Sequence, residues 1–106
     1  AKRSVAELVN DWGALKERVK HHRASPEEYR GATVYLSNLG MFPGITQFDA
    51  IVPLGAAAIL SVGAAKDDTA LFTFNYDHRV VSGADAARFL VRLGDILGEP
   101  EGWGTQ

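Results

Sequence analysis

Residues 77–84 read Asp-His-Arg-Val-Val-Ser-Gly-Ala and lie between two segments with clear periodicity. Before them, residues 71–76 (Leu-Phe-Thr-Phe-Asn-Tyr) have the composition of a strand. After them, apolar residues recur at helical spacing up to Leu97, and Ser82 followed by Asp85 is a typical helix start. Gly98 stands where a helix-ending glycine is expected. The stretch therefore predicts a loop that joins a strand to a helix.

A second strand is predicted just upstream. Residues 56–62 form a nearly continuous apolar run that ends at Gly63, which is typical of a short buried strand. Residues 66–69 (Lys-Asp-Asp-Thr) have the composition of a turn. We therefore expect residues 56–62 and 71–76 to pair as a hairpin.

A third strand is predicted at residues 32–38, where side chains alternate between apolar and polar. Residues 38–44 contain two glycines and a proline and predict a loop. Residues 45–52 are expected to form a short extended segment that ends at Pro53.

The N-terminal part predicts two helices. Ser4 and Glu7 have the spacing of a capping box, and an apolar stripe at helical spacing follows over residues 5–19. Ser25, followed by proline and two glutamates, predicts the start of a second, short helix that ends at Gly31.

The composition is that of one small globular domain over residues 1–106, with 46% hydrophobic and 23% charged residues. The order helix, strands, helix predicts an α+β fold with a mixed or antiparallel sheet. The net charge of −2 gives no electrostatic reason to expect a nucleic acid or an anionic membrane as partner. No apolar run reaches the roughly 18 residues of a membrane span. The tail to Gln106 carries no structural signal.

Motifs for metals and nucleotides do not occur in the sequence. There is no cysteine and no H-x-x-x-H pair, so we expect no metal site, and neither G-x-x-x-x-G-K nor G-x-G-x-x-G is found. The candidate for chemistry is His78, because loops after strands often carry functional groups. A histidine of ordinary pKa, about 6.5, takes up a proton near neutral pH. The alternative is a histidine that only hydrogen-bonds the chain around it.

Five stretches of the chain, taken in order, match a known set of patterns. Residues 25–29 fit x-P-E-E-Y, residues 31–42 are similar to G-x-T-F-T-I-S-N-L-G-M-F, and residues 47–51 to Q-F-x-A-I. Residues 57–63 are similar to A-A-I-L-G-V-G, and residues 77–84 to D-H-R-V-V-D-G-A. These patterns are those of the dihydrolipoyl acyltransferases of 2-oxo acid dehydrogenase complexes. The chain resembles the C-terminal half of their catalytic domain.

The resemblance implies a fold like that of chloramphenicol acetyltransferase, here as a partial or reduced domain with a mixed sheet flanked by helices. It implies trimers that build a larger core, with the active site between subunits. It also implies that His78 is the general base on the thiol of coenzyme A or dihydrolipoamide, and that Ser37 donates a hydrogen bond to the oxyanion. Ser82, Asp77, Arg79 and Asn38 are expected to support this site.

The same resemblance implies the substrates and partners. Coenzyme A is a substrate, the lipoyl group is carried on a separate domain or chain, and other subunits of the complex are partners. Neither a metal, a nucleic acid nor a membrane is expected. The Ala- and Gly-rich composition suggests a bacterial source and a cytoplasmic location, or the mitochondrial matrix if the source is eukaryotic.

The sequence departs from the pattern in three places. The motif's aspartate is Ser82, the segment from Gly63 to Phe72 is shorter than usual, and the N-terminal half of the domain is absent. We therefore expect either a fragment or a naturally reduced relative. The departures keep open the alternative of a non-catalytic, trimer-forming assembly or scaffold module. A small-molecule acetyltransferase of the chloramphenicol type is a third, minor possibility.

Overall fold

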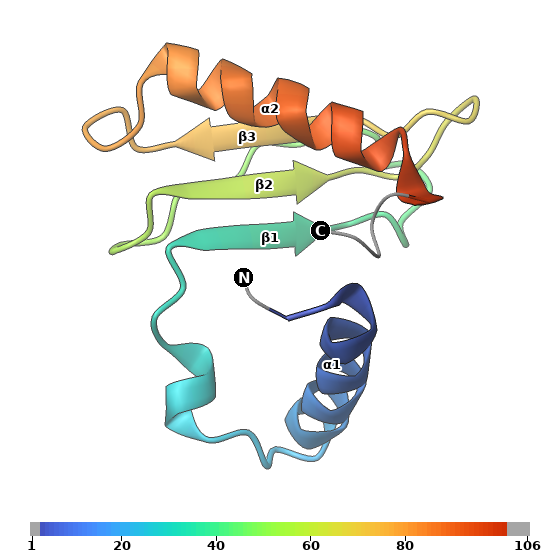
Figure 1. The fold of residues 1–106 in the computed structure, drawn as a ribbon, viewed down its shortest axis with the longest axis vertical. Helices are drawn as coiled ribbons and strands as arrows, with labels where there is room; N and C mark the ends of the chain where they lie inside the picture. Colours follow the sequence, from blue (N-terminus) through green and yellow to red (C-terminus); the bar gives the residue numbers. More distant parts are fainter. Residues whose placement is uncertain (1–2, 102–106) are drawn as a thin grey trace. The chain divides into compact units, whose positions relative to one another are not determined.

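The computed structural model describes residues 3–101, which contain two α-helices, one 3₁₀-helix and three strands (Figure 1). The chain divides into two compact units, one formed by the described parts of residues 1–31 and 91–106, and the other by residues 32–90. The second unit contains the sheet and the start of the C-terminal helix. Every residue expected in the active site lies in this second unit.

The sheet has three strands in the order β1-β2-β3. Strand β1 (Val34–Asn38) runs parallel to β2 (Ala58–Val62), and β2 runs antiparallel to β3 (Phe72–Tyr76). The arrowheads of β1 and β2 therefore point to one end of the sheet and that of β3 to the other (Figure 1). The predicted hairpin of the second and third strands is confirmed, and the sheet is mixed.

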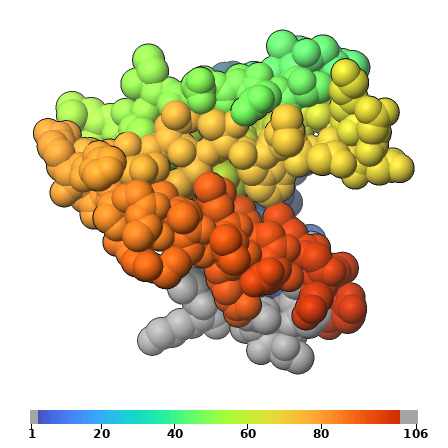
Figure 2. Space-filling view, turned by 90° about the horizontal axis from the view of Figure 1, so that it is seen from above, coloured from blue at the N-terminus to red at the C-terminus, as the bar shows by residue number. Residues whose placement is uncertain are grey.

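The core lies on the middle strand. Four successive residues of β2, from Ala58 to Ser61, are buried, while β1 at one edge is largely exposed. The start of helix α2 (Gly83–Leu97) packs on one face of the sheet, where the ring of Phe89 stacks on that of Phe74 with 4.7 Å between the ring centroids. The space-filling view shows the start of α2 directly against the atoms of β3 (Figure 2).

The β2–β3 connection contains a tight two-residue turn. Lys66 and Thr69 form a bridge, with hydrogen bonds of 2.8 and 3.0 Å in the two directions. Between them, Asp67 and Asp68 have φ values of 52° and 61°. Positive φ at both central residues defines a type I′ turn, whose twist matches that of the flanking chain.

The end of β2 depends on a glycine. A side chain at Gly63 would place its Cβ 2.1 Å from the carbonyl oxygen of Thr46, so only glycine fits there. The predicted extended segment at residues 45–52 does not form a strand. It is held instead by single contacts, because the Ala64 N–H donates to the Ile45 carbonyl at 2.7 Å and the Ala50 N–H donates to Asn75 Oδ1 at 3.2 Å.

The N-terminal unit begins with helix α1 (Val5–Lys20), whose capping box is confirmed. The Glu7 N–H donates to Ser4 Oγ at 3.2 Å, and the Ser4 N–H donates to the Glu7 carboxylate at 3.3 Å. The predicted short helix is the 3₁₀-helix η1 (Pro26–Tyr29), which also has a capping box. The apolar stripe of α1 is exposed rather than buried, with Trp12 at 62%.

Candidate active site

The loop after β3 is shaped by the side chain and the carbonyl of Asp77. Its carboxylate Oδ1 accepts the backbone N–H of Arg79 at 2.9 Å. Its backbone carbonyl accepts the N–H groups of Val80 and Val81, each at 2.9 Å. Such aspartate turns fix a short loop without any regular secondary structure. His78, between Asp77 and Arg79, is therefore presented by a tightly folded loop.

Arg79 completes this arrangement with its guanidinium. Nε donates to Asp77 Oδ1 at 3.0 Å and Nη2 donates to Oδ2 at 2.9 Å, so the carboxylate is held by two parallel hydrogen bonds. The side chain of Asp77 is 20% exposed and that of Arg79 is 87% exposed. The hydrogen bonds from Arg79 hold the pKa of Asp77 below its usual range, and Asp77 in turn raises the pKa of Arg79.

The imidazole of His78 is exposed and lies beside the ring of Tyr76. The two ring centroids are 5.7 Å apart with an angle of 38° between the planes. An exposed imidazole on a fixed loop is accessible to a thiol that arrives from outside the chain. His78 is therefore an exposed residue of a folded loop, next to Tyr76.

A cavity of about 330 Å³ lies next to this loop. It is lined by the residue before β1, the chain before β2 and the loop itself: Thr33, Gly55, Ala56, Ala57, Asp77, Arg79 and Val80. Of these residues, only Asp77 and Arg79 were predicted from the sequence to belong to the site. Gly55 has a φ of 87°, which glycine adopts readily, and the backbone bends there. The glycine itself is the one signal of this bend in the local sequence.

Ser37 lies toward the other end of the sheet. It is the fourth residue of β1, half-buried, and pairs with Ser61 of β2, which pairs with Thr73 at the start of β3. The loop of His78 follows the opposite end of β3, where the Asp77 N–H donates to the Ala57 carbonyl. The fold therefore does not bring Ser37 and His78 together within one chain.

The two remaining supporting residues shape the backbone next to these positions. Asn38 Oδ1 accepts the N–H of Gly40 at 2.7 Å, which fixes the turn after β1. Ser82 Oγ accepts the N–H of Asp85 at 3.1 Å, so Ser82 is the N-cap of α2, as predicted. Hydrogen bonds from Arg88 and then from Ser82 hold the pKa of Asp85 below its usual range.

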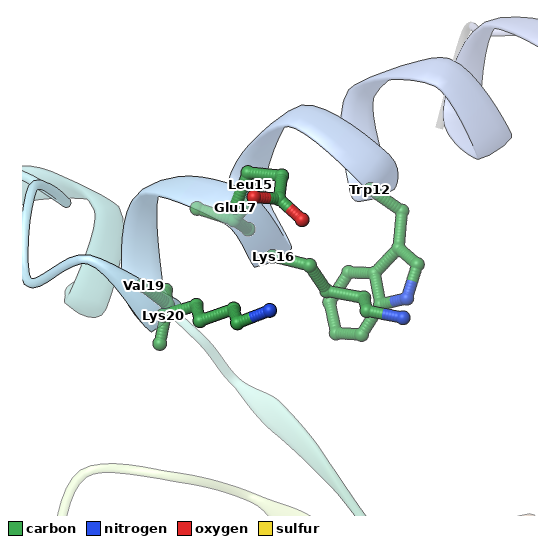
Figure 3. Close-up of a pocket in the computed structure, with 6 residues that line it drawn as sticks. All are labelled: Trp12, Leu15, Lys16, Glu17, Val19 and Lys20. Carbon is green, nitrogen blue, oxygen red and sulfur yellow. The ribbon is translucent and has the colours of Figure 1, made fainter.

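A second cavity, of about 440 Å³, lies on α1 in the other unit (Figure 3). Its described lining is Trp12, Leu15, Lys16, Glu17, Val19 and Lys20. Among residues 3–101, no cluster of three or more metal-ligating side chains is found. In the same part of the chain, no helix has the length and apolar character needed to cross a membrane.

Comparison with known families identifies the chain. The model of the 2-oxoacid dehydrogenases acyltransferase family (catalytic domain) matches residues 1–105. The chain belongs to this family. It is 38% identical to component 4 of the chloroplastic pyruvate dehydrogenase complex of Arabidopsis thaliana, a dihydrolipoyllysine-residue acetyltransferase, over 89% of the chain. It is 36% identical to the corresponding acetyltransferase of Zymomonas mobilis over 94% of the chain.

Solved structures of this acyltransferase family confirm the α+β fold. The dihydrolipoamide acetyltransferase of Azotobacter vinelandii superposes with a TM-score of 0.75 at 35% identity, over 91% of this chain and 44% of that one. The cubic core of the pyruvate dehydrogenase multienzyme complex gives 0.74 at 34% identity, with the same coverage. The chain spans only 22% and 25% of the length of the two curated relatives.

The Azotobacter vinelandii structure was determined to examine a serine, a histidine and an asparagine in the catalytic mechanism. In that enzyme the asparagine follows the histidine by four residues, and Ser82 follows His78 by the same four. The serine there precedes the histidine by 52 residues, whereas Ser37 precedes His78 by 41.

Proposed function

We propose that this acyltransferase domain moves an acyl group between dihydrolipoamide and coenzyme A, in a site formed by two copies of the chain. His78 of one copy is the general base, and Ser37 of the next copy donates to the oxyanion. The observation that carries the proposal is the placement of these two residues at opposite ends of one sheet. A site between subunits reconciles this separation with their joint role.

The separation follows from the strand register. Ser37, Ser61 and Thr73 lie in one row across the sheet, and His78 comes five residues after Thr73 along the chain. At about 3.3 Å per residue, Tyr76 at the end of β3 lies about 10 Å along the strand from Thr73, and the two strand spacings between β1 and β3 add about 10 Å across the sheet. Ser37 is therefore roughly 14 Å from the end of β3, which His78 follows. An oxyanion donor must lie about 3 Å from the developing charge, and the base must lie equally close to the thiol. One copy therefore cannot serve one thioester with both residues.

The chemistry follows from the two side chains. The His78 imidazole takes the proton of the attacking thiol, which is mostly protonated at neutral pH because its ordinary pKa is about 8.5. The thiolate attacks the thioester carbonyl, and the Ser37 hydroxyl donates to the oxyanion that forms. When the intermediate collapses, the second thiol leaves with the proton held by His78. The acyl group has then changed carriers and the imidazole is neutral again.

The remaining site residues support this step from a distance. The Asp77–Arg79 pair fixes the backbone on both sides of His78. Asn38 fixes the turn directly after Ser37, and Ser82 anchors α2 to the end of the loop. The lipoyl group would arrive on a separate domain, and the chain would work in a trimer or larger core with other subunits of the complex. The compartment would be the cytoplasm of a bacterium, or the mitochondrial matrix of a eukaryote.

The test is acyl transfer from acetyl-coenzyme A to dihydrolipoamide, with His78→Ala compared with the unmodified chain at equal concentration. We expect the variant to lose transfer, with a loss of at least about 100-fold from removal of the base. His21→Ala is the matched control, because His21 is also an exposed histidine but lies at the end of α1. Unchanged transfer by a folded His78→Ala variant would refute the proposal.

The alternative is a non-catalytic assembly module, and one observation favours it. Ser82, at the position of the motif's carboxylate, is already occupied by capping α2 and brings no charge to the site. If the unmodified chain forms trimers but transfers no acyl group, and its His78→Ala variant behaves identically, the assembly role replaces the enzymatic one.

A further inference from the structure

The hydroxyl of Ser61 is the one buried side-chain polar atom among residues 3–101 that has no hydrogen-bond partner. Ser61 lies in the middle of β2 and is only 1% exposed. A buried hydroxyl without a partner is costly and therefore calls for an explanation. The family pattern quoted above has a glycine at this position, so the hydroxyl is a feature of this chain rather than of the pattern.

Ser61 shares a face of the sheet with Ser37. The two residues are paired in the parallel register of β1 and β2, and paired residues point to the same side of a sheet. Thr73 completes a row of three hydroxyl side chains on this face. The opposite face is the one that carries Phe74, on which Phe89 of α2 stacks. Ser61 is thus an immediate neighbour of the proposed oxyanion donor.

Residues 45–50 lie against this face of the sheet, next to the row of hydroxyl side chains. The Ala50 N–H donates to Asn75, which lies in the next row on the same face, and the Ala64 N–H donates to the Ile45 carbonyl just beyond the end of β2. Residues 45–50 are thus tied to the sheet on both sides of Ser61. Neighbouring strands lie about 4.8 Å apart, so two serine hydroxyls in one row are within reach of a hydrogen bond after rotation about χ1.

We propose that Ser61 is a positioning residue: its hydroxyl, which has no partner in the structure, donates to Ser37 Oγ after rotation about χ1 and so holds the Ser37 O–H toward the oxyanion. This proposal rests on the proposed role of Ser37. A hydroxyl that accepts one hydrogen bond becomes a better donor for another, because chains of hydrogen bonds polarise one another. Burial strengthens the effect, since the surrounding medium screens the pair less than water does.

The first experiment measures the urea midpoint of Ser61→Ala in two backgrounds, with Ser37 intact and with Ser37→Ala. With Ser37 present, loss of the hydrogen bond should lower the midpoint. With Ser37→Ala, the Ser61 hydroxyl has no partner, so its removal should raise the midpoint. An equal shift in both backgrounds would overturn the pairing. Thr73→Val is the matched control, and coupling of Ser61 to Thr73 instead of Ser37 would also overturn it.

The second experiment measures acyl transfer by the same variants. Ser61→Ala should lower kcat about 3- to 10-fold with KM unchanged when Ser37 is present, and should change nothing in the Ser37→Ala background. An equal loss in both backgrounds would show that Ser61 does not act through Ser37. The effect of Ser61→Ala on the urea midpoint could depend on Ser37 in a chain that transfers no acyl group. That result would support the Ser61–Ser37 hydrogen bond and contradict the proposed function.

Discussion

Mixing two inactive variants tests the proposed site between subunits most directly. Each His78→Ala chain keeps Ser37, and each Ser37→Ala chain keeps His78, so neither variant alone contains a complete site. If one site draws its histidine from one copy and its serine from the next, a mixed trimer can contain intact sites. The separation of roughly 14 Å between Ser37 and the end of β3 excludes a complete site within one chain.

The expected recovery follows from the symmetry of the trimer. In an equal mixture with free subunit exchange, half of the positions supply His78 and half supply Ser37. Both are then intact in about one quarter of the sites of a cyclic trimer. Removal of an oxyanion donor lowers kcat about 100- to 1000-fold, so the separate variants should show at most about 1% of the normal rate. The recovered activity should therefore exceed this background by more than tenfold.

The assay is acyl transfer from acetyl-coenzyme A to dihydrolipoamide, before and after subunit exchange that native mass spectrometry verifies. The control is a mixture of Ser37→Ala with the double variant Ser37→Ala/His78→Ala, which contains no intact serine and should recover nothing. A mixture that has exchanged its subunits but transfers no faster than the average of the separate variants would refute the reasoning.

Three further predictions concern single residues. Gly63→Ala should lower the free energy of unfolding by about 3 kcal/mol, because its Cβ would overlap the Thr46 carbonyl, and urea denaturation measures this. Ser82→Ala should cost about 1 kcal/mol through loss of the α2 cap, seen in the same measurement; no loss would mean that the cap is dispensable. The lowered pKa of Asp77 implies stability that is fully present above about pH 4 and is lost as the pH falls through that pKa. Asp77→Asn should therefore flatten the dependence of the urea midpoint on pH between about 2 and 5, and an unchanged curve would contradict this.

The elements of the fold were predictable from the sequence because each has strong local signals. The box of Ser4 and Glu7 and the cap at Ser82 mark both α-helices, and the apolar run of β2 marks the one strand that is buried. Residues 45–52, predicted as a short extended segment, lie outside the three strands of the sheet. They make only single hydrogen bonds to the strands, and a periodicity of apolar residues does not distinguish such a segment from a strand.

The sequence predicts individual residues of the site but not how they are arranged in space. Asp77-His78-Arg79 is contiguous, so its loop could be located from the sequence, and the hydrogen bond that Arg79 donates to Asp77 is local. The relation of Ser37 to His78 depends on strand order and direction, which no local pattern contains. The same holds for the row that places Ser61 beside Ser37. The parallel pairing of β1 with β2 places Ser37 far from His78 and next to Ser61.

Because Ser37 and His78 lie at opposite ends of the sheet, the oligomeric state of the chain tests both the enzymatic and the assembly role. If the active site lay within one chain, the enzyme could work as a monomer, and sedimentation of the unmodified chain would test only the assembly role. With its site divided between copies, the enzyme needs association as much as the scaffold does. We therefore expect a trimer or larger species at assay concentrations, and transfer that falls more steeply than in proportion to dilution. A chain that stays monomeric at all concentrations yet transfers acyl groups would contradict the shared site, and a monomer without activity would contradict both functions.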